Sequence, residues 1–226
     1  MNRLRPFKSP IPEEFLLLIG ACDVTIHGVK VTTHLANCVK AVDKHIADLR
    51  SYLECNTKVV GLDVKNLNHG HNNKQAIILC VFRRCIIIHF DYLVNPSCKV
   101  PVSLDNFLQD PKICFVGVTE LPKMRYILEF SNNVTNVGVK VGDLGARILR
   151  KPALIGANLA DIAHQVGVSY DGPESATAEI EMDKRNPMVF TDQHVVAAIS
   201  DAYAYLSNWL QAFDYLLNQH YYYLLN

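Results

Sequence analysis

Three strand-like runs stand close together in this chain and constrain its fold more than any other feature. The runs extend from Lys58 to Lys65, from Ala76 to Phe82 and from Cys85 to Leu93, and β-branched residues are frequent in them. The polar stretch Asn66 to Lys74 and the Arg83–Arg84 pair are short enough to serve as hairpin turns between them. We therefore expect the three runs to pair as neighbouring strands of one sheet.

Further elements are predicted around this sheet. Asp23 to Leu35 is rich in β-branched residues and is broken at Gly28, which indicates two short strands joined by a tight turn. Val39 to Leu53 carries apolar residues at helical spacing, which is typical of an amphipathic helix. Ile113 to Val118 is a nearly continuous apolar run, as expected for a strand that is buried on both faces.

The part of the chain beyond residue 100 is predicted to be mostly helical. We expect helices at Val102 to Asp110, Leu121 to Phe130, Leu144 to Arg150, Asn158 to Val166 and Asp192 to Leu217, and a strand at Val134 to Val141. Strands concentrated in the first half and helices in the second predict an α/β fold with a mixed sheet flanked by helices.

The composition is that expected of one intracellular domain. Half of the 226 residues are hydrophobic, enough for one sizeable core, and no apolar run predicts an export signal or a membrane span. We expect an N-terminal arm and lead-in at residues 1–21, the domain at residues 22–217, and an aromatic tail at residues 218–226. An apolar tail of this kind is expected to dock on its own domain or on a partner subunit.

The cysteines indicate neither a zinc finger nor a disulfide framework. The chain has 7 cysteines, an odd number, and they form no CxxC pair. Reduced thiols in an intracellular protein are the simpler interpretation.

Several segments match, in order, the motifs of a nuclease family. Val59 to Lys65, read as VVGLDVK, resembles the first motif of the DnaQ-like, or DEDD, 3′–5′ exonucleases, which reads like VVGLDVEW. Phe115 to Val118 resembles the start of their second motif, and Leu159 to Gly167 is similar to a helix of the Werner-type and ribonuclease D branch. Phe190 to Tyr203 resembles the closing segment. The resemblance implies a ribonuclease H-like fold, and small stand-alone plant members of the family are similar in length.

The resemblance also implies a metal site, because family members hold two divalent ions with four carboxylates. The first motif places two of them at positions i and i+2, which share one face of a strand. Here those positions hold Asp63 and Lys65, and an ammonium group repels a cation and cannot ligate it. The closing motif retains Asp201 but has Ala197 in place of the tyrosine that orients the attacking water.

The second motif departs from the family pattern as well. Ungapped matching puts Lys123 at the position of the family's aspartate, while a shifted alignment would offer Glu120 as a substitute acid. We expect Asp63 and Asp201 to be neutralised by Lys65 and Lys123 in place of metal ions. The alternative is that both lysines point to solvent.

These departures lead to three functional hypotheses. The first is a catalytically inactive exonuclease-like protein without a cofactor that binds RNA, single-stranded DNA, a protein partner or further copies of itself, and not a membrane. The second is an active exonuclease in which Asp63, Glu120 and Asp201 act with Mg²⁺ or Mn²⁺, Asp63 and Asp201 being metal ligands. The third is a regulatory subunit without nucleic-acid contact, in keeping with the net charge of zero.

A neutral chain can bind nucleic acid only through a local basic patch. The candidates for phosphate contacts are Arg83, Arg84, Arg147, Arg150 and Lys151. As surface residues of a neutral protein they also have a simpler role, which is to keep the protein soluble.

Overall fold

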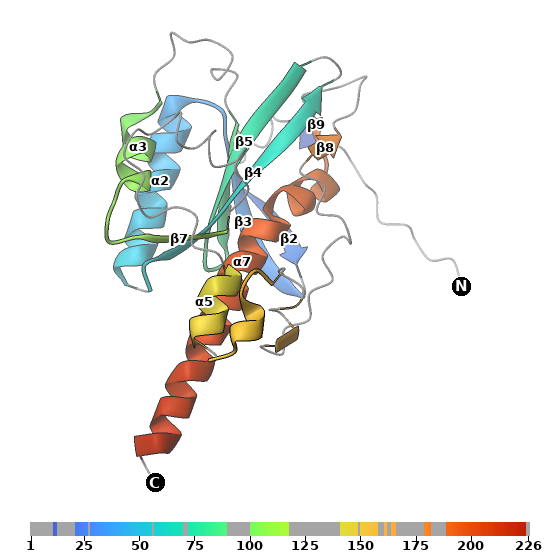
Figure 1. Cartoon of the computed structure of the whole chain (residues 1–226). Helices are drawn as coiled ribbons and strands as arrows, with labels where there is room; N and C mark the ends of the chain where they lie inside the picture. The colour runs from blue at the N-terminus through green and yellow to red at the C-terminus, as the bar shows by residue number, and fades with distance from the viewer. Residues whose placement is uncertain are drawn as a thin grey trace, which may run out of the picture.

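A computed structural model of the chain describes residues 11–12, 21–26, 28–55, 57–69, 72–89, 100–117, 141–148, 150–157, 161, 164–165, 179–181 and 189–224. The described residues form a mixed β-sheet with helices on both of its faces (Figure 1). The prediction of an α/β fold with a mixed sheet flanked by helices is confirmed.

The main sheet combines hairpins with parallel pairings. Its strand order is β2-β3-β6-β5-β4-β7, and β8 also pairs with β4. The β3–β6, β4–β7 and β4–β8 pairs are parallel, and the others are antiparallel. The strands are β2 (Cys22–Ile26), β3 (Val29–Ala36), β4 (Val59–His69), β5 (Asn72–Val81), β6 (Arg84–His89), β7 (Cys114–Gly117) and β8 (Glu179–Glu181). A separate antiparallel pair consists of β1 (Ile11–Pro12) and β9 (Val189–Phe190).

The helices divide the core into two layers. The elements are α2 (Val39–Glu54), α3 (Val102–Leu108), α5 (Val141–Ile148), the 3₁₀ turn η2 (Pro152–Leu154) and α7 (Asp192–Leu224). On one face, α2 and α3 bury Ile46, Leu49 and Phe107 with Phe115 of β7. On the other face, α7 packs Ile199 and its neighbours against the sheet. None of the helices among the described residues is both long and apolar enough to span a membrane.

The strands β4 and β5 are longer than their apolar runs. The predicted hairpin is present, but the polar stretch Asn66 to Lys74, predicted to be its turn, lies mostly within these two strands, so the predicted extent of the turn is wrong. Two contacts explain the extension: Gln75 Nε2 donates to Asn66 Oδ1 at 2.8 Å, and β8 pairs with Asn66 to Asn68. The second turn consists of Phe82 and Arg83, while Arg84 already belongs to β6.

The other predicted elements are confirmed in part. The helices predicted near residues 102, 144 and 192 correspond to α3, α5 and α7, but Val141 begins α5 and does not end a strand. The predicted helix at Leu121 to Phe130 and the remainder of the strand at Val134 to Val141 lie outside the described residues, as does most of the predicted helix at Asn158 to Val166.

The expectation that all cysteines are reduced is wrong for one pair. Cys80 and Cys85 form a disulfide across the β5–β6 hairpin, with their Cα atoms 4.2 Å apart. The two residues are directly opposite in the antiparallel register, so their side chains lie next to each other. Sequence spacing alone did not reveal this pairing, because it depends on where the turn falls.

A buried ion cluster as the candidate functional site

The candidate site lies at a gap along one edge of β4. Along this edge β7 pairs with Val59 to Leu62, and β8 pairs with Asn66 to Asn68. Asp63 to Lys65 lie between these two pairings, at the carboxyl end of β7. In α/β sheets, functional sites concentrate where parallel strands end and the chain diverges to either side.

Two glycines allow α7 to lie directly against this part of the sheet. A Cβ atom at Gly61 would lie 2.0 Å from the carbonyl oxygen of Ala202 on α7. Gly117 has φ +129°, and a Cβ atom there would lie 2.2 Å from the carbonyl oxygen of Leu62 on β4 and 2.8 Å from Cδ2 of Tyr205 on α7. Because Asp201 immediately precedes Ala202, the same close approach brings Asp201 to the face of β4 that carries Asp63 and Lys65.

One ammonium group bridges two carboxylates at this place. Lys65 Nζ lies 3.1 Å from Asp63 Oδ2 and donates a hydrogen bond to Asp201 Oδ2. The side chains of Lys65, Asp63 and Asp201 are 2%, 1% and 7% exposed, so all three charged groups are withdrawn from water. We call these three residues the ion cluster.

The electrostatics of the ion cluster favour a protonated lysine. Burial acts to lower the pKa of Lys65, but the negative charges of Asp63 and Asp201 and their hydrogen bonds outweigh it, so that the pKa is raised above 10.5. Buried charges persist only when they are paired and hydrogen-bonded. The three side chains therefore depend on one another.

The structure places Lys65 between the two aspartates, whereas we expected Lys65 and Lys123 to share their neutralisation. Lys65 contacts both aspartates by itself, and the alternative that it points to solvent is wrong. Lys123 and the substitute acid Glu120 lie outside the described residues.

The ion cluster does not suit a divalent cation. The Lys65 ammonium lies between the two carboxylates that the cation would have to share, and it has three donors and no acceptor to offer. Hard cations require oxygen ligands, so Lys65 would have to be displaced first. Across the described part of the chain, no group of three or more His, Cys, Asp and Glu side chains is arranged to hold a metal ion.

Helix α7 positions Asp201 from a well-defined start. The Thr191 N–H group donates to His194 Nδ1 at 3.3 Å, and the His194 N–H group donates to Thr191 Oγ1 at 3.2 Å. This reciprocal pair is a capping box in which histidine takes the usual glutamate position. Ala197, one turn before Asp201, is exposed and has no polar side-chain atom with which to orient a water molecule.

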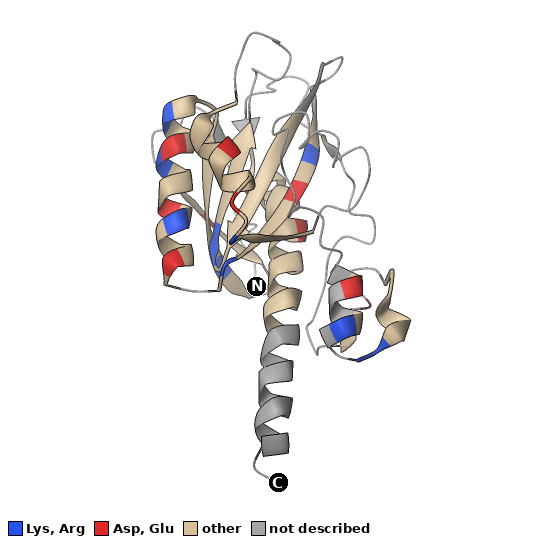
Figure 2. Cartoon of the chain, turned by 60° about the vertical axis from the view of Figure 1, so that its left-hand side comes forward, with Lys and Arg blue, Asp and Glu red and all other residues tan. Residues whose placement is uncertain are grey.

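The basic candidates lie in two separate groups, on different elements. Arg83 is exposed at the β5–β6 turn, and the Arg84 guanidinium lies 4.2 Å from the centre of the Tyr52 ring. Arg147, Arg150 and Lys151 are exposed at the end of α5 and just beyond it, where Lys151 Nζ donates to Gln165 Oε1 at 2.7 Å. Charges of both signs alternate along the outer side of α2 (Figure 2).

The fold and the site together define a mixed-sheet α/β domain with a buried aspartate–lysine–aspartate cluster at the edge of β4. No protein-family model matches the sequence, and no curated protein matches it.

Solved structures similar to the chain include crystal structures of the EXD2 exonuclease domain. The one soaked in Mg and GMP has 19% sequence identity and a TM-score of 0.44, over 83% of this chain and 93% of that chain. The one soaked in Mg has 20% identity and a TM-score of 0.42, over 78% of this chain and 87% of that chain.

Proposed function

We propose that this chain is a catalytically inactive member of the DnaQ-like 3′–5′ exonuclease superfamily, with a ribonuclease H-like fold, that binds single-stranded nucleic acid. The order of its motifs supports the family. The single observation that carries the inactive state is the Lys65 ammonium, which bridges Asp63 and Asp201 in the interior.

The chemistry of phosphodiester hydrolysis gives this observation its weight. In two-metal hydrolysis one ion generates a hydroxide nucleophile, and both ions stabilise the charge that develops on the phosphate. The Lys65 ammonium neutralises the carboxylates, but it cannot lower the pKa of a bound water as a dication does. Loss of the metal ions costs orders of magnitude in rate, and Ala197 adds no group that would compensate.

A cleavage and binding assay tests this proposal. Purified protein is incubated with 3′- and 5′-labelled single-stranded RNA and DNA, with and without Mn²⁺, and Asp63→Ala is the matched control. We expect binding without shortening of either strand. Metal-dependent trimming from the 3′ end that is lost in Asp63→Ala would instead establish an active exonuclease that uses Asp63, Glu120 and Asp201. If the protein neither binds nor trims any of the strands, a regulatory subunit becomes the better explanation.

A second variant tests the ion cluster directly. Lys65→Glu restores the carboxylate pattern of the first family motif and removes the ammonium from between the aspartates. We expect Mn²⁺ to raise the melting temperature of Lys65→Glu and to leave that of the unmodified protein unchanged. A clear Mn²⁺-dependent rise in the unmodified protein would show that Lys65 does not exclude the metal.

A further inference from the structure

The tip of the β5–β6 hairpin presents an exposed aromatic ring on an unfavourable backbone conformation. Phe82 has φ +53°, and the residue is 38% exposed. Positive φ is rare for bulky residues, whereas glycine adopts it at little cost and would expose no apolar surface. A phenylalanine at this position is unfavourable for both the backbone and the solvation of the folded protein. Strained residues of this kind concentrate at functional sites.

Several contacts hold this tip in place. The buried disulfide Cys80–Cys85 closes the hairpin directly behind the turn. The Thr32 N–H group of β3 donates to the Arg83 carbonyl oxygen at 2.9 Å, and Arg84 is stacked on Tyr52 of α2. The tip is therefore ordered before any ligand arrives, which lowers the entropic cost of binding.

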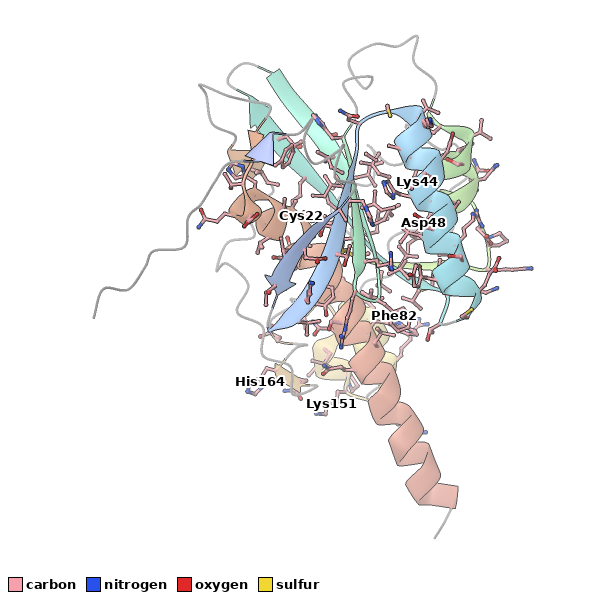
Figure 3. All side chains as sticks on the ribbon, turned by 180° about the vertical axis from the view of Figure 1, so that it is seen from behind. Cys22, Lys44, Asp48, Phe82, Lys151 and His164 are labelled. Carbon is pink, nitrogen blue, oxygen red and sulfur yellow. A yellow bond between two sulfur atoms is a disulfide. The ribbon has the colours of Figure 1, made fainter. Side chains whose placement is uncertain are left out.

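The chemistry of the tip suits an anion with flat rings. Arg83 is exposed beside Phe82. Its charge also reaches Tyr203, because burial raises the pKa of Tyr203 and the positive charge of Arg83 partly opposes this rise. Asp23, which is in register with Thr32 of β3 and through it with Arg84, is paired with Lys30 Nζ at 2.7 Å. Among the described residues Arg83 forms no ion pair, so its positive charge is available to a ligand. Phe82 lies at the end of the sheet that is also reached by the C-terminal end of α2 (Figure 3).

We propose that Phe82 and Arg83 form a docking site for single-stranded nucleic acid, with a base stacked on the Phe82 ring and the adjoining phosphate bound by Arg83. Aromatic rings interleaved with arginines are the usual platform for single strands, because every base has a face to stack. The proposal rests on the proposed nucleic-acid binding and gives it a location. This location is distinct from the ion cluster: Lys65 pairs with Ala76, and the six residues from there to Phe82 span about 20 Å of strand.

Fluorescence anisotropy with a labelled single-stranded oligouridylate and its oligothymidylate counterpart tests the docking site. Phe82→Gly removes the ring and relieves the backbone, so we expect it to melt at a higher temperature and yet to bind about tenfold more weakly. Phe82→Tyr keeps a stacking ring and should bind as the unmodified protein does. Arg83→Gln should weaken binding. It should also make the plot of log binding constant against log salt concentration less steep, by about 0.7.

The control is Val102→Ser, which removes another exposed apolar side chain, 72% exposed on α3, and should leave binding unchanged. Undiminished binding by Phe82→Gly would overturn the docking site and leave the proposed function standing. If the unmodified protein binds neither oligonucleotide, both proposals fail, and a role of the tip in contacts with a protein becomes the better explanation.

Discussion

At the scale of single residues, Lys65 determines what the site can do. Its ammonium forms ion pairs with two carboxylates, one from a strand and one from a distant helix, and water screens the three buried charges little. Each charge would be costly to bury alone, because the desolvation of one ion amounts to several kcal/mol. The ion cluster is therefore a structural element of the fold in addition to being a barrier to metal binding.

Replacement of Lys65 by an apolar residue of similar length should be strongly destabilising. Lys65→Met leaves Asp63 and Asp201 buried near each other without their shared counter-ion. We expect a loss of about 3–5 kcal/mol in the free energy of unfolding, measured by urea denaturation at neutral pH. Lys58→Met, at an exposed position just before β4, is the control and should cost less than about 0.5 kcal/mol.

The pH range of this effect follows from the raised pKa of Lys65. A group whose pKa is raised by folding stabilises the folded state below its unfolded pKa, here 10.5. The difference between the unmodified protein and Lys65→Met should therefore persist from neutral pH to about pH 10 and diminish only at higher pH. A difference that is already absent at pH 7 would contradict the bridging role of Lys65.

At the scale of elements, the contact between β4 and α7 creates the site. Gly61 has no space for a side chain beside Ala202, and only this close packing brings Asp201 within reach of Lys65. If β4 carried a side chain at position 61, that side chain would hold α7 further away from the strand. Gly61 and Gly117 thus contribute to the site through the close packing that they allow.

Gly61→Ala should displace α7. The added Cβ atom would lie 2.0 Å from a backbone oxygen, so the helix or the strand must shift, and we expect a loss of about 1–3 kcal/mol in stability. The single tryptophan of the chain, Trp209, belongs to α7 and lies in the core between this helix and the sheet, so it should report the shift as a change in its emission spectrum. Gly28→Ala is the matched control: it carries a positive φ and has open space around it, so it should lose some stability without altering the emission.

The elements also show what the sequence could and could not predict. Periodicity located α2 and the strand cores, because burial of one helix face or strand face leaves a repeating apolar pattern. The extension of β4 and β5 was missed because Asn66 and Gln75 satisfy each other across the hairpin. The Lys65–Asp201 contact joins residues 136 positions apart, so only the family motifs pointed to it, and the motifs could not show that one lysine reaches both acids.

At the scale of the whole molecule, the stability of the domain should depend on a histidine in the layer opposite the ion cluster. His45 of α2 is 5% exposed, and its ring stacks on His34 of β3 at a centroid distance of 4.2 Å. Burial, with smaller contributions from the charges of His34 and Lys44, lowers the pKa of His45 from 6.5 to about 4, and Asp48 opposes this change. Lys44 and Asp48 lie on the same helix (Figure 3).

The unfolded chain therefore binds a proton at His45 at a higher pH than the folded chain does. The contribution of His45 to stability is fully present above pH 6.5 and is lost as the pH falls from 6.5 towards 4. We expect urea denaturation at pH 5 to give a free energy of unfolding lower than at pH 7, with about 1–2 kcal/mol of the decrease due to this ring, after allowance for partial hydration. His45→Gln should lose that part of the dependence, while His164→Gln, at an exposed position, should retain it. Equal slopes in the unmodified protein and His45→Gln would mean that protonation of this ring does not oppose folding, and that carboxylates alone set the acid limit of the domain.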